Sequence, residues 1–124
     1  MKKLYLISVI LILLLAIGHC AQENTDANTW DFGRVKEGEV LRHIFVLKNE
    51  SKKILKINDV STSCGCTVSE VKKKVLRPKE STSINVTFNS KGYFAMVQQS
   101  VYLFTDSLDN PVIRFIIKAY VVKK

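Results

Sequence analysis

Helical periodicity is missing from this 124-residue sequence. After the first twenty residues, no stretch keeps apolar side chains at positions i, i+3, i+4 and i+7, the spacing that an amphipathic helix needs. Proline and glycine are scarce, with two and five residues, and there is no low-complexity tract. Because 47% of the residues are hydrophobic, we expect a folded, non-helical domain rather than a disordered chain.

Motifs for catalysis are missing as well. The chain has no Gly-x-Ser-x-Gly nucleophile motif, no glycine-rich phosphate loop, no His-Glu-x-x-His helix and no recognisable catalytic pair of carboxylates. The usual routes to acyl, phosphoryl or glycosyl transfer therefore lack their parts. His43 lies among apolar neighbours, where a structural role is more common than that of a base. We expect no enzyme activity and no cofactor.

Acidic residues are too few to balance the basic ones, so the formal charge is +8. Removing Lys2 and Lys3 with the N-terminal segment described below lowers it to +6. The other basic residues are scattered or lie in short groups at 52–53, 72–74 and 123–124, which is typical of solvated loop tips. No basic face with interleaved aromatic residues is visible, so nucleic acid is not an expected partner.

The first twenty residues have the layout of a secretory signal peptide. Two lysines precede an apolar run from Leu4 to Ile17, which is shorter than the ~20 residues of a membrane-spanning helix. The following Gly18-His19-Cys20 resembles a bacterial lipobox, in which the cysteine is acylated and becomes the new N-terminus. His19 departs from the small residue that is usual there, and cleavage before His19 by ordinary signal peptidase also fits, so both sites remain open.

Residues 21–29 are polar and free of aromatic side chains, the composition of a flexible tether. Two acyl chains on Cys20 would anchor the protein stably, whereas one binds a membrane only marginally. Acylation of Cys20 would also leave Cys64 and Cys66 as an even pair in an oxidising compartment. We therefore expect an exported protein of the cell envelope that is held on a bacterial membrane through Cys20.

Short alternating apolar runs recur along residues 30–124 and predict one all-β domain. Ser81–Phe88 alternates most clearly and places Ile84, Val86 and Phe88 on the buried face. Trp30 and Phe32 are expected to fill the core. About seven strands at this spacing indicate a β-sandwich. The clearest strands are expected at residues 30–32, 40–48, 54–60, 81–88, 97–105 and 112–122.

The segment Cys64-Gly65-Cys66 is the one feature with chemical potential. In an extended segment, residues i and i+2 face the same side, so the two sulfurs can lie together. Three interpretations are open: buried structural thiols, a strained and labile redox pair, or a soft-metal site that also uses His43 or Met96. Two sulfurs are weak evidence for a metal, and we expect none to be bound.

Three blocks of the sequence resemble the domain-of-unknown-function family 1573. They are Trp30–Gly38, Phe45–Asn49 and Thr62–Val68, and the similarity extends to about Val121. The resemblance implies an exported protein, often a lipoprotein, with an immunoglobulin-like sandwich similar to those of the major-sperm-protein type, which are mostly interaction and scaffold modules. Lys79 and Ala119 stand where the family usually has glycine.

These features predict a non-catalytic interaction or scaffold module at the cell envelope. Its expected partner is an envelope protein or glycan, and its contact with the membrane is the acylated Cys20. An alternative hypothesis is a periplasmic protein that handles thiols or soft metals through Cys64 and Cys66.

Overall fold

The computed structural model describes residues 26–65 and 67–124. The predicted signal segment, the lipidation site Cys20 and most of the predicted tether lie outside the described residues. Cys66 also lies outside them.

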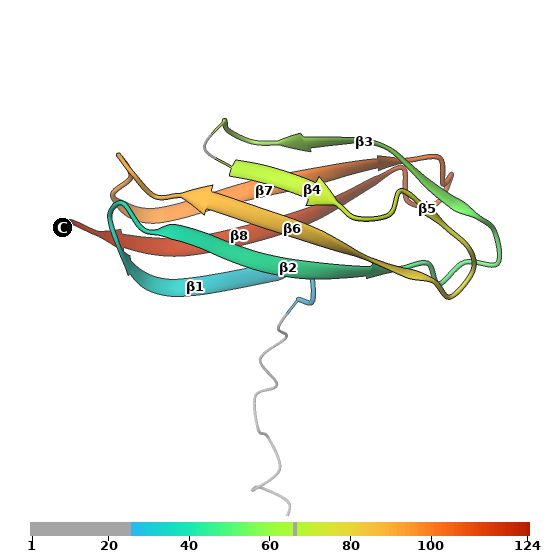
Figure 1. Ribbon diagram of the computed structural model, residues 1–124, viewed down its shortest axis with the longest axis horizontal. Coiled ribbons are helices and arrows are strands. Elements are labelled where there is room, and N and C mark those ends of the chain that lie inside the picture. Colours follow the sequence, from blue (N-terminus) through green and yellow to red (C-terminus); the bar gives the residue numbers. More distant parts are fainter. Residues whose placement is uncertain (1–25, 66) are drawn as a thin grey trace, which may run out of the picture.

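Eight strands form two stacked sheets, and the described residues contain no helix (Figure 1). The prediction of an all-β sandwich is therefore confirmed. One sheet has five strands in the order β1-β8-β7-β3-β5, and the other has three in the order β2-β6-β4. The strands are β1 (Thr29–Lys36), β2 (Val40–Lys48), β3 (Leu55–Thr62), β4 (Thr67–Val71), β5 (Val75–Leu76), β6 (Ser81–Asn89), β7 (Ala95–Thr105) and β8 (Val112–Val122).

The strand count differs slightly from the predicted seven. The bounds of β2 and β8 agree with the expected ranges, and β6 and β7 extend one or two residues further. The two-residue strand β5 pairs only Leu55 with Leu76 and Lys56 with Val75. A strand of this length shows no alternation, because period-2 patterning needs at least four residues to be recognised.

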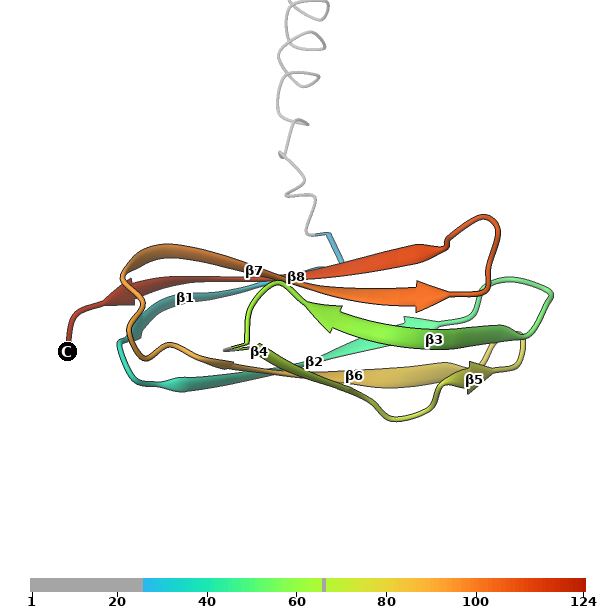
Figure 2. The same cartoon turned by 90° about the horizontal axis from the view of Figure 1, so that it is seen from above.

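Alternation places the core between the two sheets, which form separate layers in Figure 2. In β6, Ile84, Val86 and Phe88 are fully buried while Asn85 and Asn89 are exposed, as predicted. Each apolar side chain that leaves water here contributes about 25 cal/mol per Å² of buried surface. The largest fully buried side chains are Phe88, Phe115, Leu76, Ile84, Leu103, Val86, Val101 and Val121.

The first and last strands lie side by side. β1 pairs with β8 in parallel, whereas the other paired strands run antiparallel. The pairing shifts register between Asp31 and Arg34, and Gly33 at this point has φ +72°. The Asp31 carboxylate accepts a hydrogen bond from the Gly33 amide at 2.8 Å. β1 therefore continues beyond the predicted residues 30–32, with a bulge at its glycine.

Asn49 fixes the turn that leaves β2. Its side chain is buried and its Nδ2 donates to the carbonyl oxygens of Lys53 and Leu76 at 2.8 and 3.0 Å. Its Oδ1 accepts from the backbone amide and the hydroxyl of Ser51 at 3.1 and 2.7 Å. One amide side chain thus ties the β2–β3 turn to β5. Asn49, the last residue of the Phe45–Asn49 block, therefore has a structural role.

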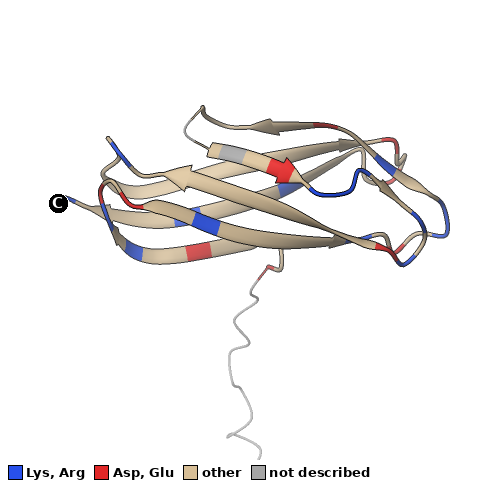
Figure 3. Cartoon of the chain, viewed as in Figure 1, with Lys and Arg blue, Asp and Glu red and all other residues tan. Residues whose placement is uncertain are grey.

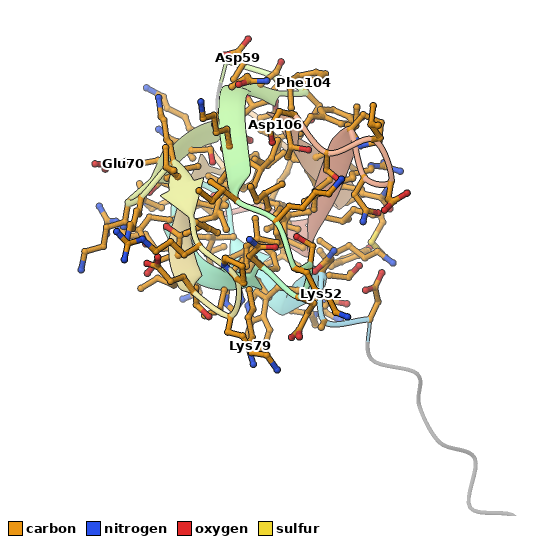
Figure 4. All side chains as sticks on the ribbon, turned by 90° about the vertical axis from the view of Figure 1, so that its right-hand side faces the viewer. Lys52, Asp59, Glu70, Lys79, Phe104 and Asp106 are labelled. Carbon is orange, nitrogen blue, oxygen red and sulfur yellow. The ribbon has the colours of Figure 1, made fainter. Side chains whose placement is uncertain are left out.

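The turn at Arg77–Glu80 joins β5 to β6 at the end of the sandwich viewed in Figure 4, where Lys79 is labelled. The Glu80 amide donates to the Arg77 carbonyl oxygen at 3.0 Å, and Lys79 has φ +72°. Proline at the second position followed by a residue with positive φ defines a type II turn, in which glycine is usual at the third position. Lys79 therefore occupies a position whose backbone favours glycine, the residue that the resemblance to family 1573 leads us to expect there.

Replacing Lys79 with glycine should stabilise the protein. The left-handed conformation costs a residue with a Cβ about 1–2 kcal/mol, and the greater entropy of glycine in the unfolded chain offsets part of this gain. We expect Lys79→Gly to raise the free energy of unfolding in urea by about 0.5–1 kcal/mol. Lys79→Ala keeps the strained backbone and should bring no gain, so equal stability of the two variants would contradict this explanation.

Candidate functional site

The two sheets leave one side of the sandwich open between their edge strands β1 and β2. These strands belong to different sheets and are not neighbours in either one. Aromatic rings fill the space between them. Trp30 on β1 stacks on His43 of β2 at 4.3 Å between ring centroids, with Phe32 and Phe45 edge-on to His43 at 6.5 and 4.6 Å. The stack closes the core where no backbone pairing does so.

Trp30 is less buried than predicted. It was expected in the core together with Phe32, but 44% of it is exposed, whereas Phe32 is partly buried and packs against the core. The reason is the position of β1 at the edge of its sheet. In the part of the chain that the structure describes, no strand lies beyond β1 to cover the outer side of the indole, so its ring is covered mainly by His43.

β2 is the longest regular edge of the molecule. All nine of its residues pair with β6 without a register shift, from Val40 with Asn89 to Lys48 with Ser81. Among the described residues, β2 has no other neighbouring strand. Its outward face carries Ile44 and Val46, which are 60% and 68% exposed, between Arg42 and Lys48. A regular edge with exposed β-branched side chains is a template for another strand.

The other strands that end the two sheets are short or bulged, unlike β2. β5 has two residues and β4 has five, and β4 is followed directly by Lys72, Lys73 and Lys74. β1 carries the bulge at Gly33. Short strands, lysines and bulges all discourage pairing with another chain. The contrast makes the β2 edge, together with the adjoining Trp30 and His43 rings, the leading candidate for a binding site.

The cysteine segment lies where the chain crosses from one sheet to the other. β3 ends at Thr62 in the five-stranded sheet and β4 begins at Thr67 in the three-stranded sheet. Ser63 anchors the start of this crossing, because its amide donates to the Ser100 carbonyl oxygen and its hydroxyl accepts from the Ser100 amide, both at 2.9 Å. The crossing is therefore attached to β7 rather than free in solvent.

Cys64 is disulfide-bonded, and its partner lies outside the described residues. Its sulfur is 3.3 Å from the Tyr93 hydroxyl oxygen and 3.8 Å from the Thr67 hydroxyl oxygen. Tyr93 in turn packs against the core beside Phe88. Two hydroxyl groups directed at one sulfur can stabilise negative charge on it if the bond is reduced. Sequence analysis missed Tyr93, because it lies 29 residues from Cys64 in the chain.

His43 and Met96, the further ligands considered for a metal, lie elsewhere. His43 stacks on Trp30 at the β1/β2 side, and Met96 is 69% exposed on the five-stranded sheet. Among residues 26–65 and 67–124, no three side chains of His, Cys, Asp or Glu gather as a metal site would require. In the same part of the chain, no helix has the length and apolar character needed to cross a membrane.

A hollow of about 490 Å³ lies at the other end of the sandwich, between the β2–β3 and β7–β8 turns. Its polar groups are used to hold these turns. The Asp106 carboxylate accepts from the Lys56 amide at 2.9 Å, and the Ser107 hydroxyl accepts from the Asn110 amide at 3.2 Å. Lys52 and Asp106 mark this end in Figure 4. The hollow is consequently a by-product of the turns rather than a prepared site.

His43 is the titratable group at the β1/β2 side. Burial among aromatic rings lowers its pKa from the ordinary 6.5, because desolvation penalises the imidazolium. The folded protein thus favours neutral His43, while the unfolded chain takes up a proton as the pH falls below about 6.5. The contribution of this group to stability is complete above pH 6.5 and is lost as the pH falls through 6.5 towards the lowered folded-state pKa.

We expect the free energy of unfolding to decrease between about pH 7.5 and pH 5.5, a window set by the ordinary histidine pKa. His43→Phe keeps a ring against Trp30 but cannot titrate, so its stability should fall less over the same range. Trp30 is the sole tryptophan of the chain, and its fluorescence during urea unfolding provides the measurement. Parallel pH profiles for the two proteins would show that His43 does not cause the effect.

The comparisons with solved structures define the class of fold. A protein of unknown function from Porphyromonas gingivalis W83 has a TM-score of 0.66 at 16% identity and covers 75% of this chain and 44% of that chain. The Vibrio cholerae protease VesB gives 0.60 at 15% identity, covering 76% and 30%. PapD-like domain 7 of human CEP192 gives 0.58 at 13% identity, covering 78% and 82%. This chain is thus a β-sandwich of the PapD-like, immunoglobulin-like type.

The family follows from the sequence match. The model of the protein family of unknown function DUF1573 matches residues 24–121. The chain belongs to this family, which confirms the resemblance carried by its three sequence blocks. It spans less than half the length of the Porphyromonas gingivalis chain. No curated protein matches it significantly.

Proposed function

We propose that this protein is an exported, membrane-tethered module that binds an extended segment of a partner protein along strand β2. The observation that carries the proposal is the nine-residue β2 edge, which is regular, lacks a second neighbouring strand among the described residues and exposes Ile44 and Val46. A strand added there would extend the three-stranded sheet. Its main-chain hydrogen bonds would supply affinity, and alternate side chains would supply specificity.

The geometry of the edge sets the character of the partner segment. On the outward face, its side chains would lie beside Ile44 and Val46 and between two cations, Arg42 and Lys48. On the inward face, they would approach Trp30, whose ring is 44% exposed over His43. A segment of alternating β-branched or aromatic residues with an acidic residue at its ends fits these surroundings.

Export and anchoring rest on residues 1–29. Their signal-like layout, the cysteine after the apolar run and the polar stretch that follows support attachment to a bacterial membrane through Cys20. The attached module would face the envelope compartment, where other exported proteins are its available partners. We infer a binding or scaffold role without catalysis, because the β2 edge offers backbone groups and apolar side chains and no reacting group.

The β2 edge should select peptides with strand-like patterning. We expect a displayed library of random nine-residue peptides to yield binders with alternating apolar residues. Ile44→Lys and Val46→Lys should weaken these binders about tenfold or more, because each removes an apolar contact worth about 1.5–3 kcal/mol when fully buried. The measurement is the dissociation constant of the selected peptides for each variant.

The matched controls are Asn85→Lys and Thr87→Lys. Both residues lie on the same outward face but on the central strand β6, opposite Ile44 and Arg42 in register. They add the same charge without altering the edge, and peptide binding should change less than twofold. Peptides that bind the β2 variants as tightly as the parent protein would place the site elsewhere, and a library without binders would contradict strand addition.

A second candidate function is thiol–disulfide exchange, favoured by the disulfide state of Cys64. We propose Cys66 as its partner, since acylation of Cys20 leaves only that cysteine. A thiolate of an external dithiol would attack one sulfur of the bond, and the other would leave as a thiolate. Cys64 is the better leaving group, because the Tyr93 and Thr67 hydroxyls at 3.3 and 3.8 Å can donate to its charge.

Intact mass of the protein purified from its native membrane tests the anchor and the disulfide together. We expect an acylated chain beginning at Cys20, with two alkylated thiols only after reduction. In Tyr93→Phe, the Cys64 thiol should titrate at higher pH and react more slowly with an alkylating reagent at neutral pH. If both thiols are alkylated without reduction, no disulfide is present in the purified protein, which contradicts the exchange proposal. An unacylated chain beginning at His19 would remove the anchor.

A further inference from the structure

The outer face of the five-stranded sheet is unusually apolar for a surface without a covering layer. Cross-strand pairs of β7 and β8 place Met96 beside Tyr120, Tyr102 beside Arg114 and Phe104 beside Val112. Met96 is 69% exposed, and Tyr120, Phe104 and Val112 are all exposed as well. Phe94, two residues before Met96, is also exposed. We call this surface the β7/β8 face.

Cations are interspersed with these side chains. On β1, β7 and β8, the outward positions carry Arg34, Lys36, Arg114 and Lys118 with the carboxylate Asp31, and the neighbouring β3 adds Asp59 beside Phe104. The blue segments of β1 and β8 in Figure 3 mark basic residues in these strands. The Arg34 guanidinium lies 5.4 Å from the centroid of the Tyr120 ring, and Lys123 Nζ lies 6.0 Å from that of Phe94. Apolar, aromatic and cationic groups thus share one surface.

The opposite outer face has a different character. Along its central strand β6, the outward residues are all small or uncharged polar side chains. They are Ser81, Ser83, Asn85, Thr87 and Asn89. The central strand β6 is thus polar on its outward side, whereas the interior strands β7 and β8 of the five-stranded sheet carry apolar and basic side chains there. On the opposite face, Arg42, Ile44 and Val46 lie on the edge strand β2.

The chain enters the domain through the five-stranded sheet, which carries the β7/β8 face. The described residues before β1, 26–28, lie at this sheet beside β8. The Ile116 amide of β8 donates to the Asn28 carbonyl oxygen at 2.8 Å, which fixes this entry. From Cys20 to Thr29 a fully extended chain spans at most ~30 Å. An anchor at Cys20 would therefore keep this face within reach of the membrane.

We propose that the β7/β8 face lies on the surface of an anionic lipid bilayer, with Arg34, Lys36 and Lys118 against the headgroups and Met96, Tyr120 and Phe94 at the interface. The proposal rests on the tether of the proposed function, because the tether brings the face to the membrane. Aromatic residues favour the membrane interface, and cations are attracted to anionic headgroups. This orientation also leaves the β2 edge, which belongs to the other sheet, available to a partner.

Lysine footprinting of the protein purified from its native membrane tests the orientation. The protein is mixed with vesicles of phosphatidylcholine, with or without phosphatidylglycerol, and labelled with an amine-reactive ester. On the anionic vesicles we expect labelling of Lys36 and Lys118 to slow about fivefold, the effect of one cation at an anionic surface. The labelling rates of Lys48 on β2 and Lys72 after β4 should not change. High salt should restore the labelling rates of Lys36 and Lys118 to those without vesicles.

A pair of double variants provides the matched comparison. Arg34→Gln with Met96→Gln removes one cation and one apolar side chain from the β7/β8 face and should abolish the protection. Arg42→Gln with Val46→Gln makes the same chemical change on the outward face of β2 and should leave it intact. Protection that survives the first pair, or that is lost equally in both, overturns the proposal.

Flotation with neutral vesicles separates this proposal from the tether. A protein that floats with both kinds of vesicle, without slower labelling of Lys36 and Lys118, keeps its anchor and refutes the orientation. A protein that floats only with anionic vesicles and shows the protection lacks the anchor, while the face still binds lipid. Equal protection by a soluble anionic polymer, dextran sulfate, would assign the face to polyanions instead and overturn the lipid proposal.

Discussion

The burial of alternating apolar side chains between two sheets of unequal width is the constraint on which the rest of this structure depends. Ile84, Val86 and Phe88 of the three-stranded sheet and Phe115, Leu103 and Val121 of the five-stranded sheet share one core. The sheets meet through these side chains and through chain crossings, and among the described residues no strand of one sheet pairs with a strand of the other. Each lateral side of the sandwich must therefore be closed by other means, and both candidate sites arise from this need.

The two lateral sides are closed by different chemistry. Between β1 and β2, the stack of Trp30 on His43 covers the core but leaves the backbone of β2 open to another strand. Between β3 and β4, the covalent chain itself crosses at the cysteine segment, and Cys64 is held beside Tyr93. The ring stack between β1 and β2 leaves the β2 edge open to a binding partner. The chain crossing between β3 and β4 carries Cys64, whose sulfur can take part in disulfide exchange. The proposed function and its alternative thus occupy opposite sides of the sandwich.

The outer faces show a similar division. The three-stranded sheet presents serine, threonine and asparagine from β6 to solvent, while the five-stranded sheet presents tyrosine, methionine and arginine from β1, β7 and β8. Because the chain enters through the five-stranded sheet, the proposed tether, the β7/β8 face and the β2 edge form one consistent arrangement. The proposed lipid-facing surface and the proposed partner-binding edge use different residues.

Local sequence determined the all-β class, the extents of β2 and β8 and the buried face of β6, because period-2 alternation is written in consecutive residues and follows from backbone geometry alone. The resemblance to the family also marked Lys79 as a departure from the usual glycine. Only the positive φ of the folded turn explains why glycine is favoured there. Ile44 and Val46 were visible as apolar residues on the polar face of an alternating strand. Their role in a binding edge depended on strand order, since the backbone of a central strand would already be paired with a strand on each side.

Tertiary structure alone decided which strands lie at the edges, that Trp30 is half exposed and that Tyr93 meets Cys64. These features depend on pairing between residues far apart in the chain, such as β1 with β8, and the free energy of such pairing is not contained in any local window. The sequence by itself thus determined what each strand buries, and the assembled sheets decided what each strand leaves exposed.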